Sequence, residues 1–179
     1  FVVELLRHLA EGGAIVQADD GRWTLAHGVD AIALPQSVRD VVGQRVRRLG
    51  PDAHATLTAA AVQGREFDAE VVAAALGVDD DDVLGRLEES MTAGLVAEVP
   101  DVPDRFSFTH ALVQHTLYEE LSATRRARMH RRVAEAIEGL VGDEPGVRVG
   151  ELAKHWFAAV RPSELDRAID YAMRAGRRA

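Results

Sequence analysis

The residue best suited to chemistry in this sequence is His110, which follows the short β-type run at residues 105–108. Thr109 is the expected N-cap of the next helix, so His110 falls in its first turn. Backbone N–H groups and the helix dipole favour an anion there, and an imidazole N–H adds one more donor for a phosphate. The alternative is a histidine that only bonds locally at the helix end. We therefore treat His110 as a candidate phosphate contact.

Metal and covalent chemistry find little support in the residue pattern. The chain has seven histidines and no cysteine, which excludes disulfides and thiolate metal sites. His110 and His115 would point about 140° apart on a helix of ~3.6 residues per turn. The sequence has no HExxH, no Gly-x-Ser-x-Gly, no P-loop and no Gly-x-Gly-x-x-Gly motif. We expect neither a catalytic residue nor a metal site in this chain.

Two charged runs have simple structural interpretations. Residues 79–82 are consecutive aspartates that lack the glycine and distal glutamate of a calcium loop, so N-capping and the helix dipole account for them. The arginines between residues 125 and 132 could hold a phosphate or nucleic acid. However, Glu135 follows Arg131 at helical pairing distance, and the same helix carries an apolar face. A solvated face or an interface of ion pairs is therefore the simpler interpretation.

Composition and charge limit the class of protein. The 179 residues are 47% hydrophobic and 28% charged, with a net charge of −8, which is ordinary for a globular protein. No apolar run approaches the ~20 residues of a membrane helix, so we expect a cytoplasmic protein without a membrane contact. An acidic chain is a poor general binder of nucleic acid. Because Phe1 begins within an apolar-periodic run, we expect the chain to belong to a longer protein.

Apolar periodicity predicts a mostly α fold. A β-hairpin is expected around the Asp-Asp-Gly turn at residues 19–21, and strands at residues 95–100 and 105–108. Helices are expected at residues 1–10, 34–50, 52–64, 68–77, 79–94, 110–121, 124–142, 151–160 and 163–179. Consecutive helices followed by a two-stranded ribbon have the order of a winged-helix domain. The purely helical pattern from residue 124 suggests α-helical hairpins at the start of a solenoid.

Two apolar stripes in the last part of the chain indicate which helix faces should be buried. In the helix from residue 124, the stripe consists of Met129, Val133, Ile137 and Leu140. In the last helix, the expected inward-facing residues are Leu165, Ile169 and Met173.

Three segments together resemble the region that follows the nucleotide-binding core in bacterial STAND-type signalling ATPases. They read LPQSVRDVVGQRVRRLGPDAHATLTAAAVQGREFDAEVVAAALGV, RLEESMTAGLV and RFSFTHALVQHTLYEELSATRRARMHRRVAEAIE. Such AAA-like ATPases occur in LuxR-type transcriptional regulators and in multidomain adenylate or guanylate cyclases. In addition, FVVELLRHLAEGG resembles the lid helix of that core, and ELAKHWFAAV with AIDYAMRAGRRA resembles the start of a tetratricopeptide-like array.

The resemblance implies three domains and a nucleotide. Residues 1–33 would be the end of the ATPase lid helix plus a β-hairpin, residues 34–123 a winged-helix domain, and residues 124–179 the start of a TPR-like α-solenoid. In this family the winged-helix domain folds back on bound ADP, and a histidine matching His110 contacts the phosphates. Here Thr109 and Ala111 stand where the family motif has methionine and an acid, so only the histidine carries over.

The resemblance also implies partners. The cofactor of the whole protein would be ATP or ADP, bound mainly by an upstream nucleotide-binding domain that would be the intramolecular partner of this chain. The helical repeats would bind a protein or small-molecule ligand, and the output would be transcription regulation or a cyclase. The chain itself would be a non-catalytic regulatory part that couples nucleotide state to that binding.

Two other functions fit parts of the pattern. A winged-helix transcription factor would use residues 80–94 as its recognition helix, but this segment and the preceding Asp79 together carry six carboxylates and one arginine, a net charge of −5. Such a helix would repel DNA, because Lys and Arg supply most of the affinity for phosphates. The remaining alternative is a protein-interaction scaffold that binds no nucleotide.

Overall fold

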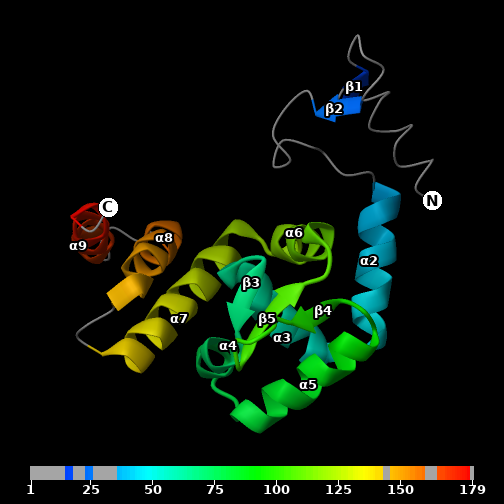
Figure 1. Ribbon diagram of the computed structural model, residues 1–179, viewed down its shortest axis with the longest axis horizontal. Helices are drawn as coiled ribbons and strands as arrows, with labels where there is room; N and C mark the ends of the chain where they lie inside the picture. The colour runs from blue at the N-terminus through cyan, green and yellow to red at the C-terminus, as the bar shows by residue number, and fades with distance from the viewer. Residues whose placement is uncertain (1–14, 18–22, 26–35, 143–145, 160–164, 178–179) are drawn as a thin grey trace. The chain divides into compact units, whose positions relative to one another are not determined.

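The computed structural model describes residues 15–17, 23–25, 36–142, 146–159 and 165–177, and the chain divides into two units at residues 42 and 43 (Figure 1). In the first unit, β1 (Ile15–Gln17) and β2 (Trp23–Leu25) pair antiparallel with Val16 opposite Thr24. This confirms the predicted β-hairpin, while its turn and the helix predicted at residues 1–10 lie outside the described residues. Helix α2 (Gln36–Arg48) runs across the boundary of the two units.

The second unit is mostly helical, as predicted. Pro51 stands at the start of its first helix, where a missing N–H and a fixed φ cost nothing. Its elements in chain order are α3 (Pro51–Gln63), β3 (Glu66–Asp68), α4 (Ala69–Leu76), α5 (Asp80–Thr92), β4 (Val96–Glu98), β5 (Arg105–Phe108), α6 (Ala111–Glu120), α7 (Ala123–Val141), the 3-10 turn η2 (Gly146–Arg148), α8 (Val149–Ala159) and α9 (Leu165–Gly176).

A three-stranded antiparallel sheet has the order β3-β5-β4, so the last strand in sequence lies in the middle. The ribbon of β4 and β5 was predicted, with the connection near residues 101–104. Strand β3 was not, because three residues are too few for an alternating pattern to stand out. Aromatic packing stabilises the pairing of β3 with β5, since Phe67 lies opposite Phe106 and their ring centroids are 6.0 Å apart.

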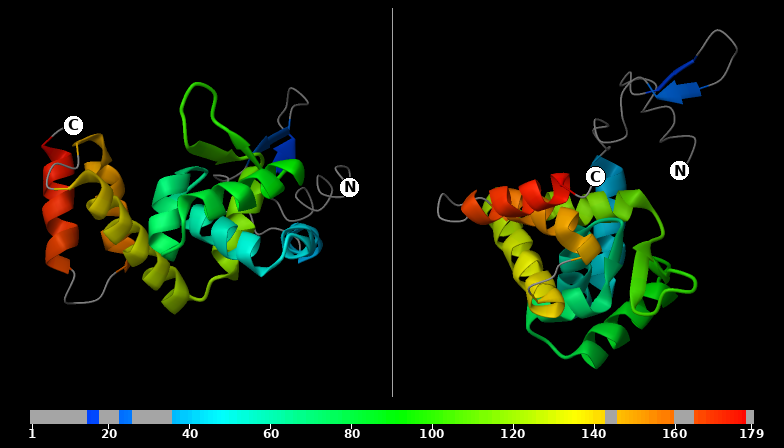
Figure 2. Two further views of the ribbon diagram at one scale, coloured as in Figure 1. Left: turned by 90° about the horizontal axis from the view of Figure 1, so that it is seen from below. Right: turned by 60° about the vertical axis from the view of Figure 1, so that its left-hand side comes forward.

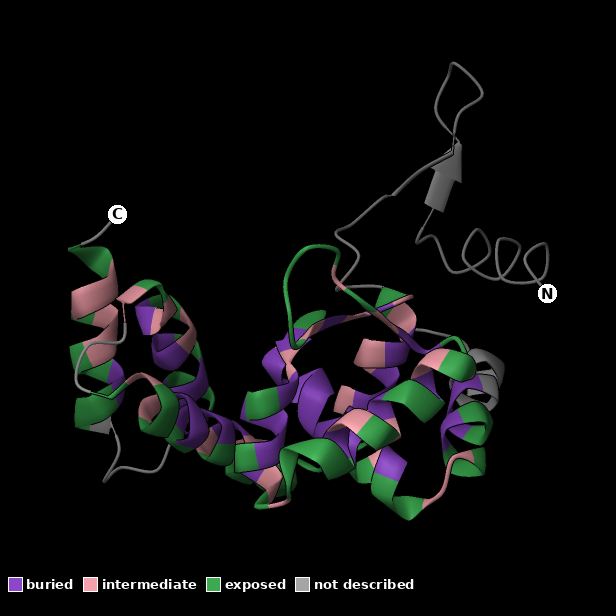
Figure 3. Ribbon diagram, turned by 60° about the horizontal axis from the view of Figure 1, so that its bottom comes forward, coloured by how far each residue is buried: buried purple, intermediate pink, exposed green. Residues whose placement is uncertain are grey.

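The core is continuous between the sheet-containing part, residues 51–108, and helices α7, α8 and α9. Buried residues, purple in Figure 3, line the inner sides of α7 and α8. One apolar cluster contains residues of α3, α4, α7, α8 and α9, namely Val62, Val71, Ala75, Val133, Ala134, Ala136, Ile137, Leu152, Trp156, Ala159 and Ala168. Helix α8 packs against α7, and α9 packs against α8, at the end of the molecule shown in yellow to red in Figure 2. The boundary that we predicted at residues 123 and 124 stays a prediction.

The inward face of α9 differs from the predicted one. Ile169 and Met173 are 41% and 51% exposed, whereas Ala168 is fully buried. The side chain of Leu165 lies outside the described part. The alanine face is the buried one because small side chains let α9 approach α8 closely, while larger apolar residues one position away turn outward. In α7, Val133 and Ile137 are buried as predicted, but Leu140 in the last turn is 39% exposed.

Candidate functional site

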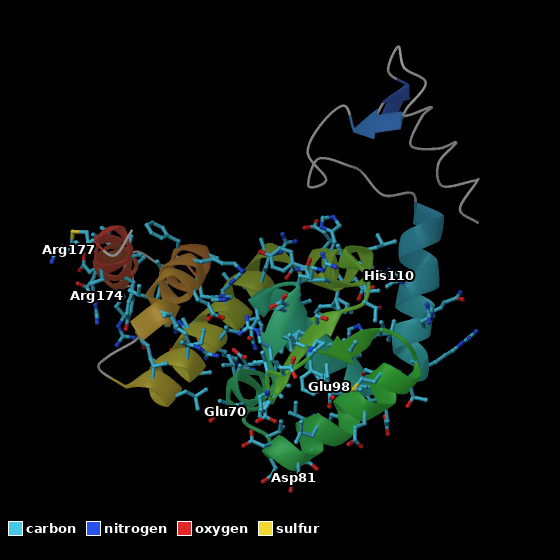
Figure 4. All side chains as sticks on the ribbon, viewed as in Figure 1. Glu70, Asp81, Glu98, His110, Arg174 and Arg177 are labelled. Atoms are coloured by element: carbon cyan, nitrogen blue, oxygen red, sulfur yellow. The ribbon has the colours of Figure 1, made fainter. Side chains whose placement is uncertain are left out.

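His110 lies at the junction between β5 and α6, where Figure 4 labels it. It is the N-cap residue of α6, with extended backbone angles of φ −133° and ψ 129°, and the helix begins one residue later at Ala111. The His110 side chain is exposed and makes no capping hydrogen bond. The His110 carbonyl accepts a hydrogen bond from the backbone N–H of Val113 at 2.9 Å. An exposed imidazole therefore stands at a helix end whose backbone N–H groups face outward.

Thr109 does not cap α6, which corrects the prediction from the sequence. Its hydroxyl donates instead to the carbonyl oxygens of Gly94 and Leu95, at 2.9 and 3.1 Å. Its backbone N–H also bonds the Leu95 carbonyl at 3.1 Å. These bonds tie the end of β5 to the segment before β4. The reason for the difference is tertiary, because the partners of Thr109 come from the turn between α5 and β4. They hold the backbone on which His110 is presented.

The acidic part of this unit lies away from His110. Asp81 on α5 and Glu98 on β4 are well separated from His110 in Figure 4. As predicted, the aspartate run caps α5, since the Asp79 side chain accepts a hydrogen bond from the backbone N–H of Asp81 at 3.0 Å. The loop between β4 and β5 adds Asp101, which is exposed and has a positive φ of 62°. A phosphate near α5 or this loop would face carboxylates, whereas at His110 it would face a helix N-terminus.

A second group of histidines lies at the junction of α6, α7 and α8, and the sequence analysis missed it. His130 and His155 are 3% and 0% exposed, and their Nδ1 atoms are 2.8 Å apart. The Tyr118 hydroxyl lies 3.0 Å from Nε2 of His130. A sequence signal existed: His130 precedes Val133 by three residues, so it falls on the apolar stripe of α7. The sequence did not predict the pair, because the residues around His130 do not show whether another helix covers this histidine.

Burial shifts the titration of this pair strongly. Burial, with help from the charges of Lys154 and Arg126, lowers the pKa of His130 to about 4. Burial, His130 and Lys154 lower the pKa of His155 to about 3. Both imidazoles are therefore neutral near pH 7, so each offers one N–H donor and one acceptor nitrogen.

A polar network connects the sheet to α8. Asp68 on β3 accepts hydrogen bonds from Arg105 of β5, at 3.3 Å, and from Arg148 of η2. The Gln63 side chain exchanges two hydrogen bonds with the backbone of Asp68, and the Gln63 carbonyl accepts one from Lys154 of α8 at 2.8 Å. The Asp68 side chain is only 17% exposed. This network therefore links α3, β3, β5 and α8 through charged groups of which Asp68 is the most shielded from water.

Glu151 on α8 lies in the field of this network. Burial raises the pKa of Glu151; Arg148 opposes the shift and Asp68 adds to it. Where the sheet meets α8, the carboxylates of Glu151 and Asp68 therefore lie in the field of three cations, Arg148, Lys154 and Arg105.

Glu138 organises the outer side of the last helices. Its Oε1 atom accepts hydrogen bonds from Nε1 of Trp156 at 3.1 Å and from the hydroxyl of Tyr171 at 2.8 Å. Burial and the bond to Glu138 raise the pKa of Tyr171 to about 12. A pocket of about 560 Å³ opens beside Glu138 and Tyr171, lined further by charged residues of α9. The pocket is open to solvent, and its lining carries both acidic and basic side chains.

Two classes of feature do not occur in the described part of the chain. Within it, no three His, Cys, Asp or Glu side chains come together as a metal site would require. No helix among the described residues has the length and apolar character to cross a bilayer.

Comparisons with models of protein families, with curated proteins and with solved structures find no match to this chain.

Proposed function

We propose that this chain is a non-catalytic regulatory part of a nucleotide-dependent signalling ATPase of the STAND type. It couples the ADP or ATP state of an upstream nucleotide-binding domain to the binding of a protein or small-molecule ligand by α7, α8 and α9. The output is an effector for transcription regulation or a cyclase. Release of this part from bound ADP is a population shift between two domain arrangements.

The order of the elements supports this proposal. The succession α3, β3, α4, α5, β4 and β5, with the sheet order β3-β5-β4, agrees with the helices and β-ribbon expected of the proposed winged-helix domain. The packing of α8 against α7 and of α9 against α8 supports a TPR-like array, whose neighbouring helices pack in chain order. The proposal places the winged helix before the repeats, as the resemblance in sequence implies.

The observation that carries the proposal is the exposed His110 at the N-terminus of α6. The helix end and the imidazole are suitable for contact with a phosphate oxygen. One histidine and one helix end cannot hold a nucleotide alone. The remaining phosphate ligands would come from the nucleotide-binding domain, which the sequence of this chain does not contain.

The test is ADP binding by the full-length protein that contains this chain, measured by calorimetry for the wild type and for His110→Ala. A contact from His110 to a phosphate predicts at least about tenfold weaker binding, or roughly 1.4 kcal/mol. His115→Ala, a half-buried histidine on the same helix, is the matched control and should bind ADP as the wild type does. Unchanged affinity in a folded His110→Ala protein would remove His110 from the site.

The same measurement separates the proposal from a scaffold without nucleotide. A full-length protein that binds neither ADP nor ATP would overturn the ATPase assignment and leave α7, α8 and α9 as an interaction module. DNA binding is disfavoured by the charge of α5, whose first turn contains Asp80, Asp81 and Asp82 and whose last turn contains no basic residue.

A further inference from the structure

A chain of three ring side chains joins α6, α7 and α8. The Tyr118 hydroxyl reaches Nε2 of His130 at 3.0 Å, and Nδ1 of His130 reaches Nδ1 of His155 at 2.8 Å. The two imidazole centroids are 5.0 Å apart, and the Tyr118 ring meets His130 edge-on with centroids 5.8 Å apart. Each of the three helices contributes one ring. The three rings therefore link α6, α7 and α8 through polar contacts within an otherwise apolar junction.

The contact between the two imidazoles depends on their protonation. A hydrogen bond between two Nδ1 atoms needs one nitrogen with a hydrogen and one without. If both imidazoles were protonated, two N–H groups would face each other at 2.8 Å and the bond would be lost. At the other end, Nε2 of His155 is buried and has no hydrogen-bond partner among the described residues. The pair therefore has no acceptor ready for an additional proton at that end.

The charged groups that act on the pair are cations. Arg126 lies over the Tyr118 ring, with its guanidinium carbon 4.4 Å from the centroid, and Lys154 precedes His155 on α8. On the elements packed around α7 and α8, the other titratable side chains are exposed or half-buried: Asp52, His54, Glu70, His115, Glu119, Glu120, Arg148, Asp166, Arg167, Asp170, Tyr171 and Arg174. A positive charge on either imidazole would thus be placed next to cations and away from bulk water.

We propose that Tyr118, His130 and His155 form an acid-sensitive latch, which holds α8 and α9 on α6 and α7 while both imidazoles are neutral and releases them when the imidazoles take up protons. The lowered pKa values of both histidines agree with this geometry. The latch is independent of the proposed nucleotide function, since it needs no ligand.

Release is local because of where the apolar contacts lie. Val62, Val71 and Ala75 of α3 and α4 belong to the apolar cluster shared with α7, α8 and α9, whereas Leu57 and Val72 are buried outside that cluster. On the side of α8, Leu152 and Trp156 flank His155, so a charge on the latter disturbs the contact of α8 with α7 first. We therefore expect α8 and α9 to open before the sheet-containing part unfolds.

Hydrogen exchange of the intact 179-residue chain between pH 8 and pH 4, corrected for the intrinsic effect of pH, tests the latch. Peptides from α8 and α9 should lose protection at a higher pH than peptides from α3 and α4. His155→Leu replaces the imidazole with an apolar side chain that cannot titrate, so its α8 should stay protected to a pH lower by about one unit, equivalent to a tenfold change in proton activity. His115→Gln, a histidine of α6 outside the chain of rings, is the matched control and should behave as the wild type.

A milder variant keeps the test decisive if His155→Leu does not fold. Tyr118→Phe retains the ring and removes only the hydroxyl that binds His130, so α8 should open at a higher pH than in the wild type. The latch is refuted if α8 loses protection at the same pH in the wild type and in a folded His155→Leu protein. If neither variant shifts the opening, or if α8 and α3 lose protection together, the pair is only part of the common core.

Discussion

His110 and the His130–His155 pair are histidine sites of opposite character within one unit. His110 is exposed at the start of α6 and makes no side-chain cap, whereas the pair is buried between α7 and α8. The exposed imidazole can meet a ligand and contributes little to packing. The buried imidazoles bond each other and Tyr118 and are shielded from water, so their protonation state is tied to the stability of the fold. Residue type alone therefore says little about the role of a histidine.

The junction of α7 and α8 should be the more sensitive of the two regions, and Trp156 tests it most severely. Trp156→Ala removes a side chain that is 1% exposed and bonds Glu138, so the free energy of unfolding should fall by about 3–5 kcal/mol. Urea unfolding measures the change. Phe157→Ala is the control on the same helix, because Phe157 is 47% exposed and its loss should cost less than about 1 kcal/mol. Equal losses would show that α8 does not pack as described.

Acid should destabilise the junction of α7 and α8. The folded pKa values of His130 and His155, about 4 and 3, lie below the unfolded value of 6.5. Stability is therefore unchanged by these groups above pH 6.5 and falls as the pH drops below it, since the unfolded chain binds protons that the folded chain does not. At pH 5 the loss should be roughly 2 kcal/mol for each histidine. Urea unfolding across pH 7.5 to 5 should show this slope in the wild type and a smaller one in His155→Leu.

The polar network between the sheet and α8 should rank next. Asp68→Ala leaves Arg105 and Arg148 without their shared carboxylate, and we expect a loss of about 1–3 kcal/mol in the free energy of unfolding. Glu66→Ala also removes a partner of Arg105, but its side chain is 55% exposed, so the loss should stay below about 1 kcal/mol. Thermal unfolding of both variants gives the comparison. A larger effect from Glu66 would contradict the ranking by burial.

The smallest effect should come from the exposed site. His110→Ala should change the free energy of unfolding by less than about 0.5 kcal/mol, because its side chain is exposed and caps nothing. Urea unfolding next to the wild type measures this. A loss above about 1 kcal/mol would mean that His110 supports α6 structurally, and a weaker affinity for ADP in that variant would then need a second substitution, such as His110→Gln, before it is attributed to a lost contact.

Local patterns predicted much of the architecture. The β4–β5 ribbon was expected from β-type runs around a short loop, and α5 was expected with its aspartates at the N-terminus. Most helices lie where apolar periodicity placed them. The third strand, β3, was not predicted, because a short strand is recognised mainly by the strand with which it pairs. The first residues of β3 and its partner β5, Glu66 and Arg105, are 39 positions apart in the sequence.

The helical character of the chain, the acidic start of α5 and the position of His110 between a strand and a helix could be predicted from local sequence. These features follow from neighbours within a few residues, through periodicity, capping and dipole effects. The contacts of His130 with His155 and of Asp68 with Arg148, and the burial of Ala168 rather than Ile169 in α9, depend on how the elements pack together. His130 and His155 are 25 positions apart in the sequence, and Asp68 and Arg148 are 80 positions apart. The burial of these side chains depends on which helix faces pack together.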